Sequence, residues 1–255
     1  MNSEESNRQR YRLLIEFDGT EFSGWQLQNE VRTVQGCIEQ ALEPLFACHP
    51  RVIGAGRTDS GVHATAMVAH FDAREPRDPE IVRKAVNANL PPDVRILDAG
   101  IADLEFHARF SAKWRGYQYR IRTVQRAINR HYSWYIPEQI PLELLNTLAS
   151  ELIGDHCFRS FCHERPDEDH YRSRIFKAEW VRDGDDVIFR IDGIRFLHGM
   201  VRLLVGTMLD ISKGSLEFSN LQQIIEKEDV RYAGTKAPAH GLTLTAVGYH
   251  DWPQL

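Results

Sequence analysis

Residues 56–61 (GRTDSG) place Arg57 and Asp59 in a short loop between two apolar segments. A carboxylate can attack an electron-poor carbon and hold a covalent intermediate. A carboxylate in a dry pocket tends to take up a proton, so it needs a neighbouring cation to remain ionised. Glycine, serine and aspartate are also ordinary turn residues, and the loop could be only a connector between two strands. The rest of the chain has to distinguish these interpretations.

Arg202 is a second candidate, because it stands in a strongly apolar helical pattern beside Val201, Leu203 and Leu204. An arginine in such a place is expected to be buried only when it has a partner. The alternative is an exposed arginine on the polar side of the helix.

The segment 106–137 contains no aspartate or glutamate, although the net charge of the chain is −5. It combines cations with aromatic rings: Arg109, Lys113, Arg115, Arg120, Arg122, Arg126 and Arg130, with Phe106, Phe110, Trp114, Tyr117, Tyr119, Tyr132, Trp134 and Tyr135. Cations neutralise phosphates and rings stack on exposed bases, which favours a nucleic-acid surface. The alternative is a solvated charged face. The acidic groups at 167–169 and 183–186 are interpreted as the far side of a polarised molecule.

Composition indicates an ordinary globular protein of 255 residues with 42% hydrophobic residues, enough for one large domain or two smaller ones. No apolar run is long enough to cross a bilayer, and residues 1–10 are too polar for a signal peptide. We therefore expect a soluble, cytoplasmic protein. The four cysteines are expected to be reduced thiols: Cys37, Cys48, Cys157 and Cys162.

The order of predicted elements repeats once along the chain. The first half has strands at 11–17, 51–55, 66–71 and 94–101, a helix capped by Thr33, and a helix capped by Asp78. The buried apolar face of this second helix is predicted to consist of Ile81, Val82, Ala85 and Val86. The second half has strands at 113–124, 174–182, 187–191 and 242–249, and helices at 141–153, 197–211 and 221–225. Gly154 is expected to close the helix at 141–153.

Both halves thus read β-α-β-β-α-β, apart from the extra short helix. We predict an α+β fold of two ferredoxin-like halves, residues 1–105 and 106–255, whose antiparallel sheets join side by side and leave a cleft. This topology hosts many activities, so it does not establish a function by itself.

Several separated motifs closely resemble the tRNA pseudouridine synthase A family, whose hallmark reads GRTDAGVH. They are GRTDSGVHA from Gly56, FDGTEFSGWQLQNEVRTVQG from Phe17, NANLPPDV from Asn87, FHARFSAKWRGYQYRI from Phe106, FLHGMVRLLVGTM from Phe196 and KAPAHGLTL from Lys236. The resemblance covers nearly the whole chain. The departures are modest: Ser60 stands where the family commonly has alanine, and the acidic residues 167–169 lie where relatives often contact RNA.

The resemblance implies a pseudouridine synthase fold with a central RNA-binding cleft, and isomerisation of uridine to pseudouridine in tRNA. The expected positions are 38, 39 and 40 of the anticodon stem-loop, with no cofactor and no metal. The N1–C1′ bond must break, the uracil must rotate, and C5 must bond to C1′. Asp59 matches the family nucleophile. Attack on the sugar, attack on the base and elimination to a glycal all remain open.

The resemblance also implies roles for other residues. Arg202 matches the arginine that pairs with Asp59, and Tyr117 matches the tyrosine that stacks on the target base. Arg57 matches the arginine assigned to the gap left by a flipped nucleotide. The segment FHARF supplies the expected tRNA contacts: Phe106, His107, Arg109 and Phe110. A homodimer is implied as well.

Alternatives remain for these assignments. Tyr117 and Tyr119 share one strand face and could both be core residues. His63 is interpreted as a structural histidine that holds the loop. A non-catalytic RNA-binding module would explain the basic aromatic segment but not an acid facing RNA. A zinc site would need His156, Cys157, Cys162 and His163, which is weak evidence because no second pair of this kind follows.

Overall fold

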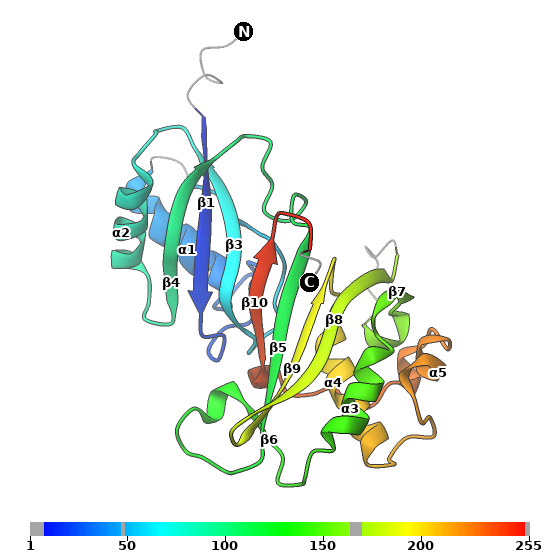
Figure 1. Cartoon of the computed structure of the whole chain (residues 1–255). Coiled ribbons are helices and arrows are strands. Elements are labelled where there is room, and N and C mark those ends of the chain that lie inside the picture. Colours follow the sequence, from blue (N-terminus) through cyan, green and yellow to red (C-terminus); the bar gives the residue numbers. More distant parts are fainter. Residues whose placement is uncertain (1–7, 47–48, 164–169, 253–255) are drawn as a thin grey trace. The chain divides into compact units, whose positions relative to one another are not determined.

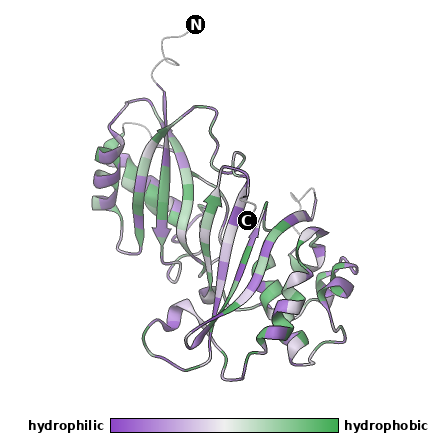
Figure 2. Cartoon of the chain, in the orientation of Figure 1, coloured by the Kyte–Doolittle hydropathy of each residue, from purple (hydrophilic) through white to green (hydrophobic). Residues whose placement is uncertain are grey.

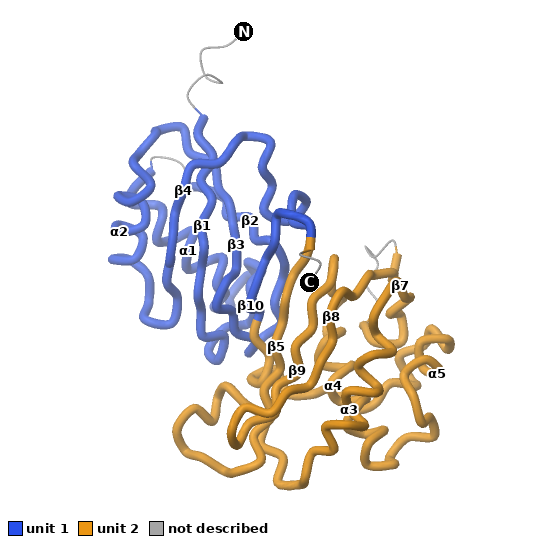
Figure 3. The backbone as a smooth tube through the Cα atoms, in the orientation of Figure 1, with its two compact units in different colours: residues 1–113, 244–251 blue, residues 114–243, 252–255 orange. Residues whose placement is uncertain are grey.

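The computed structural model describes residues 8–46, 49–163 and 170–252, so Cys48 and the acidic residues 167–169 lie outside the described residues. The chain forms two compact units (Figure 3). Unit 1 contains residues 1–113 and 244–251, and unit 2 contains residues 114–243 and 252–255. Helices and antiparallel strands occur in both units, which confirms the α+β class. The division at residue 105 into two ferredoxin-like domains stays a prediction.

The elements follow one another as labelled in Figure 1. The α-helices are α1 (Val34–Leu42), α2 (Pro79–Asn89), α3 (Leu142–Ser150), α4 (Met200–Ser212) and α5 (Leu221–Ile225). The strands are β1 (Gln9–Phe17), β2 (Ile53–Gly54), β3 (His63–Ala73), β4 (Val94–Ala102), β5 (Trp114–Arg122), β6 (Trp134–Tyr135), β7 (Gly154–Cys157), β8 (Arg172–Asp183), β9 (Asp186–Gly193) and β10 (Leu242–Gly248).

The strands of unit 1 are ordered β4-β1-β3-β10, with β2 also paired to β3. Leu13 in the centre of β1 lies opposite Ala69 of β3 and Ala99 of β4, both in antiparallel register. Hydrophobic and hydrophilic residues alternate along the strands (Figure 2), and Leu13 and Ile15 are fully buried. The order β-α-β-β-α-β predicted for residues 11–101 is therefore confirmed.

Both predicted helix caps of unit 1 are present. The Thr33 hydroxyl accepts the N–H of Gly36 at 3.3 Å, and the Asp78 carboxylate accepts the N–H of Glu80 at 2.9 Å. The predicted buried face of α2 is wrong at one position, because Ile81 is 57% exposed while Val82 and Val86 are fully buried. The short α2 buries only a narrow face, on which residues four positions apart lie.

The strands of unit 2 are ordered β5-β9-β8-β7, with β6 paired parallel to β5. Neither β6 nor β7 was predicted. The β8–β9 hairpin was predicted, and Gly184 in its turn has a φ of 59°. Two helices cover the buried side of this sheet: Asn146 of α3 bonds the backbone of Trp180, and the Trp180 ring nitrogen lies 3.5 Å from Met208 of α4.

Two helix ends differ from their predictions. The helix α3 ends at Ser150, and Gly154, with a φ of 109°, begins β7 instead of closing the helix. The helix α4 begins at Met200 instead of residue 197, because Gly199 has a φ of 75°, which is outside the helical region. The apolar pattern continues through Leu197, so periodicity alone did not reveal this boundary.

Candidate active site

The loop that carries Asp59 is held by backbone contacts with residues 19–25 in unit 1. The Trp25 N–H donates to the Thr58 carbonyl at 3.2 Å. The Phe22 carbonyl accepts the Gly61 N–H at 3.3 Å and the Ser60 hydroxyl at 3.1 Å. These bonds fix the backbone on both sides of Asp59.

Glycine is required opposite this loop because the two backbones approach closely. Gly24 has a φ of 90°, and a Cβ atom there would lie 2.6 Å from the Thr58 carbonyl oxygen. At Gly19 a Cβ atom would lie 2.0 Å from the Val62 carbonyl oxygen. The glycines of the FDGTEFSGW motif therefore permit the packing that positions Asp59.

Exposure alternates along the loop. Arg57 and Ser60 are exposed, Asp59 is half-buried, and Thr58 is only 7% exposed. The Asp59 carboxylate therefore belongs to the accessible side of the loop, while Thr58 faces the interior. Among the residues that the structure describes, Thr58 Oγ1 is a buried side-chain oxygen for which no hydrogen-bond partner is present.

His63 follows the loop and is 3% exposed. Its Nδ1 lies 3.0 Å from the Gly19 amide nitrogen and 3.1 Å from Asp18 Oδ1. Asp18 Oδ1 in turn accepts the Thr20 N–H at 3.0 Å. These contacts support the interpretation of His63 as a structural residue that joins the loop to β1.

The predicted tRNA-contact segment FHARF forms a tight turn in unit 1. His107 Nδ1 accepts the N–H groups of Arg109 and Phe110, each at 3.2 Å. The Arg10 guanidinium donates to the Phe106 carbonyl at 2.7 Å, which fixes the backbone where the turn begins. The turn leaves the Phe110 ring 75% exposed, with the Arg109 guanidinium 5.7 Å from its centroid. An exposed ring beside a cation can accept a base by stacking.

His70 supports this turn and was missed by sequence reasoning. It is 2% exposed, and its Nδ1 accepts the Ala108 N–H at 3.1 Å. Burial lowers the pKa of His70 to about 4, so the ring is neutral at neutral pH and can accept this bond. No motif marks His70, which is one polar residue within the apolar run of β3.

The other predicted catalytic residues lie in unit 2. Arg202 of α4 is half-buried, and its Nε donates to the Ala237 carbonyl at 2.7 Å. The Ala237 N–H returns a bond to the Arg202 carbonyl at 3.1 Å. The segment KAPAHG thus fixes the arginine on α4. The alternative of an exposed arginine on the polar side of α4 is wrong, because Arg202 is half-buried and bonded to that segment.

The two tyrosines of β5 differ in burial. Tyr119 is fully buried and its hydroxyl donates to the Pro238 carbonyl at 2.9 Å. Burial raises the pKa of Tyr119, although the charge of nearby Arg202 acts in the opposite direction. Tyr117 is only half-buried, and its ring meets Phe196 edge-on at 5.0 Å between centroids. Tyr119 is therefore a core residue, whereas Tyr117 keeps accessible surface.

The predicted site residues are divided between the two units. Unit 1 holds Arg57 and Asp59 on one loop and all four residues of the FHARF contact set in one turn. Unit 2 holds Tyr117 and Arg202. The pairing of Asp59 with Arg202 stays a prediction.

The basic face of β5 is largely neutralised within unit 2. Asp186, 6% exposed, accepts Arg120 Nη1 at 2.6 Å and Arg122 Nε at 2.7 Å. Burial would raise the pKa of Asp186, but the hydrogen bonds from both arginines outweigh burial and lower it. Arg126 pairs with Asp185 at 2.8 Å. The interpretation of residues 183–186 as the far side of the molecule is therefore wrong, since β9 lies directly beside β5.

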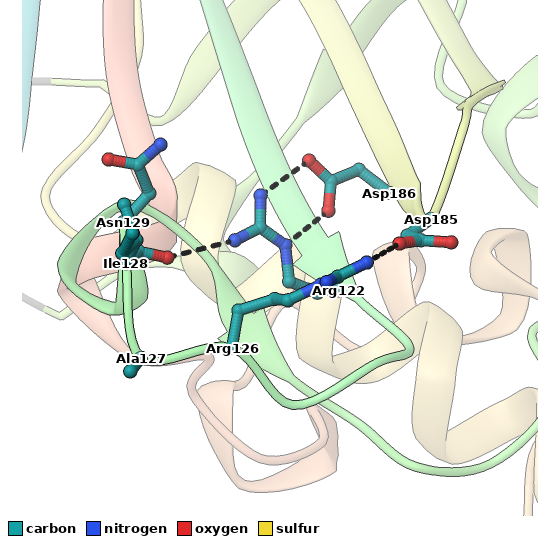
Figure 4. A pocket seen from close by; sticks show the side chains of 7 residues that line it. All are labelled: Arg122, Arg126, Ala127, Ile128, Asn129, Asp185 and Asp186. Carbon is teal, nitrogen blue, oxygen red and sulfur yellow. Dashed lines mark hydrogen bonds and ion pairs between the residues drawn. The ribbon is translucent and has the colours of Figure 1, made fainter.

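These pairs line a hollow of about 550 Å³ next to the loop 123–131. Figure 4 shows Arg122 between Asp186 and the Ile128 carbonyl, with Arg126 turned toward Asp185. The guanidinium groups contact carboxylates of the same unit. They are therefore poor candidates for phosphate contacts.

The described part of the chain contains no group of three or more histidine, cysteine, aspartate or glutamate side chains arranged to hold a metal ion. The zinc alternative gains no support from this. Within residues 8–46, 49–163 and 170–252, no helix has the length and apolarity that a membrane span requires.

Comparison with known proteins gives consistent results. A family model described as tRNA pseudouridine synthase matches residues 13–111 and 148–250. A tRNA pseudouridine synthase A of Geobacillus kaustophilus is 40% identical over 95% of both chains. The protein of that name from Anoxybacillus flavithermus is 39% identical over 95% of this chain and 99% of its own. A chain of the archaeal box H/ACA sRNP Nop10-Cbf5 complex aligns over 92% of this chain and 48% of its own, with 13% identity and a TM-score of 0.38, too distant to bear on the fold.

Proposed function

Because the chain belongs to the tRNA pseudouridine synthase family, we propose that it isomerises uridine to pseudouridine in tRNA. The observation that carries this proposal is the Asp59 loop: a half-buried carboxylate on a backbone fixed on both sides by residues 22–25. A fixed backbone restricts where the carboxylate can lie, which favours its use as a nucleophile.

The chemistry needs no group that the chain lacks. Asp59 supplies the nucleophile while the N1–C1′ bond breaks, the uracil rotates and C5 bonds to C1′. The proton on C5 must then leave, and Tyr117 provides an accessible ring and phenol for the base. Arg202 is the cation proposed to keep Asp59 ionised. Its fixed attachment to Ala237 supports a positioned guanidinium.

RNA binding is proposed to use exposed groups of unit 1. Arg57, which is exposed two residues before Asp59, is proposed to fill the gap left by a flipped nucleotide. Arg109 and Phe110 project from a turn whose backbone is held by Phe106 and His107 contacts. The proposed target positions are 38, 39 and 40 of the anticodon stem-loop.

A homodimer in the cytoplasm is the proposed working form. The end strand β4 of unit 1 carries two exposed apolar side chains, Leu97 at 43% and Ile101 at 60%. A second copy would cover such a strand edge. Sedimentation of the wild type and of Ile101→Glu tests this, with a dimer expected only for the wild type. A monomeric wild type at micromolar concentration would contradict it.

The test of function is Asp59→Asn, which keeps shape but removes charge and nucleophile. Tritium release from tRNA labelled at uridine C5 should fall to background, while tRNA binding by filter assay should stay within a few-fold of the wild type. Asp98→Asn, at an exposed aspartate of β4, is the matched control and should remain active. Turnover by the Asp59 variant would refute the proposal. A wild type that binds tRNA without turnover would favour a non-catalytic RNA-binding module.

A further inference from the structure

Arg32 and Asp93 form an ion pair in unit 1 to which the proposed mechanism gives no role. Arg32 stands just before α1, and Asp93 stands just before β4. Arg32 Nη1 and Nη2 each donate to one carboxylate oxygen of Asp93, at 2.7 and 2.8 Å. Two bonds of this kind fix the plane of the guanidinium as well as its position.

Arg32 lies against the segment that holds the Asp59 loop. Its guanidinium carbon is 4.0 Å from the centroid of the Phe22 ring, which is 2% exposed. The Arg32 carbonyl accepts the Ser23 N–H at 2.9 Å. That N–H belongs to the same planar peptide group as the Phe22 carbonyl, which accepts the Gly61 N–H at 3.3 Å. One peptide group therefore links Arg32 to the loop.

Asp93 anchors the other end of the same segment. Its backbone carbonyl accepts the Asp18 N–H at 3.0 Å. Residues 18–23 are thus attached at their start to the Asp93 backbone and at their end to Arg32. Because the Arg32 side chain also bonds the Asp93 carboxylate, the ion pair closes a ring of contacts around this segment. Loss of either charge would open the ring.

The exposure of the ion pair argues against a large role in global stability. The Arg32 and Asp93 side chains are 38% and 22% exposed, and pairs with this exposure contribute little to stability. Their two-bond geometry supplies orientation instead. Orientation matters at a reacting group, since a displacement of about 1 Å can lower a rate about a hundredfold.

We propose that Arg32 is a positioning residue for Asp59, acting through the peptide group between Phe22 and Ser23, and that Asp93 orients Arg32. This inference rests on the proposed function. Arg32 holds Phe22, the Phe22 carbonyl holds the loop, and the loop carries Asp59.

The experiment measures single-turnover tritium release, with Arg32→Gln in saturating excess over tRNA labelled at uridine C5. The rate constant should fall about tenfold or more, because the support of the loop is loosened. Binding of tRNA in a filter assay should stay close to that of the wild type. The melting temperature should fall by no more than about 4 °C. The Gly61 amide, which donates to Phe22, should exchange its hydrogen about tenfold faster.

Asp93→Asn tests whether the two residues act as a unit. It should lower the rate constant by a similar factor, and the double variant Arg32→Gln/Asp93→Asn should lose no more than either single variant. If Arg32→Gln does not fold, Arg32→Lys carries the same comparison, because lysine keeps the charge but loses the two-bond geometry.

Arg83→Gln is the matched control. Arg83 makes the same kind of two-bond pair, with Nε and Nη2 at 2.8 and 2.6 Å from the Glu80 carboxylate, and its side chain is 31% exposed. This pair lies within α2. The rate constant of Arg83→Gln and the exchange of its Gly61 amide should therefore equal those of the wild type.

Four results would overturn the inference. A wild-type rate constant in Arg32→Gln would show that the ion pair does not position the loop. Weaker tRNA binding with an unchanged rate constant would assign Arg32 to RNA contact. Losses that add in the double variant would show that Arg32 and Asp93 act independently. A slower rate with faster exchange throughout unit 1 would assign the loss to global destabilisation.

Failure of the proposed function is distinguishable from these results. An inactive wild type would refute the function, whereas the exchange of the Gly61 amide in Arg32→Gln would still test the support of the loop.

Discussion

Asp186→Asn removes the negative charge that holds two arginines on β5. Asp186 accepts Arg120 Nη1 at 2.6 Å, Arg122 Nε at 2.7 Å and Arg122 Nη2 at 3.0 Å. Breaking a buried ion pair by neutralising one partner costs about 3–5 kcal/mol. The Arg120 and Arg122 side chains keep 27% and 17% of their surface exposed, so we expect about 2–3 kcal/mol here.

The expected loss depends on pH. The pKa of Asp186 is lowered in the folded protein, so its contribution is present above the ordinary carboxyl pKa and is lost as pH falls through the folded value. The variant should therefore unfold about 4–12 °C below the wild type at pH 7. The gap should persist down to about pH 4 and close only as pH falls further, through the lowered folded pKa.

Calorimetry at pH 7 and at about pH 2 measures both effects. Asp185→Asn is the neighbouring control, because its pair with Arg126 leaves both side chains at least 50% exposed. Its effect should stay within about 0.5 kcal/mol. Equal stability of Asp186→Asn and the wild type at pH 7, or a gap as wide at about pH 2 as at pH 7, would refute the reasoning.

Three further predictions concern RNA affinity, pH and backbone strain. Phe110→Ala should weaken tRNA binding by about 1–3 kcal/mol in a filter assay without lowering the melting temperature, and unchanged affinity would exclude stacking by this 75% exposed ring. Burial raises the pKa of Asp192 to about 6, so the free energy of unfolding should fall as pH rises from about 4 to 6. In urea unfolding, Asp192→Asn should remove roughly 1–2 kcal/mol of this pH dependence, and an unaltered dependence would contradict the prediction. Gly24→Ala should lower kcat at least tenfold, because its Cβ would displace the Thr58 carbonyl 2.6 Å away, whereas Gly100→Ala, which meets no atom within 4 Å, should not.

Local sequence signals predicted much of the fold. Thr33 and Asp78 were identifiable as caps because a cap bonds to the backbone two or three residues later. The strands β6 and β7 were missed because two and four residues are too short to show a period. The start of α4 was missed because the conformation of Gly199, not the apolar pattern, sets it.

Sequence reasoning identified candidate site residues only where a chemically reactive side chain stands in a recognisable motif. Asp59 and Arg57 stand out in the sequence, and the glycines at 19 and 24 mark the close approach that holds their loop. The pairing of Asp186 with Arg122 joins residues 64 positions apart, which no local pattern reveals. Thr58 has no sequence signal at all, because its lack of a partner is a property of the folded interior.

Unit 1 is discontinuous, since residues 244–251 complete it after the whole of 114–243 has been made. During translation, the part of the β3 edge that β2 does not pair therefore stays uncovered until β10 leaves the ribosome. A chain released before residue 244 would lack the last strand of unit 1, the unit that carries Asp59, although the missing residues are far from Asp59 in sequence. Pulse proteolysis of nascent chains stalled before and after residue 251 should show protection of residues 63–73 only in the longer chain.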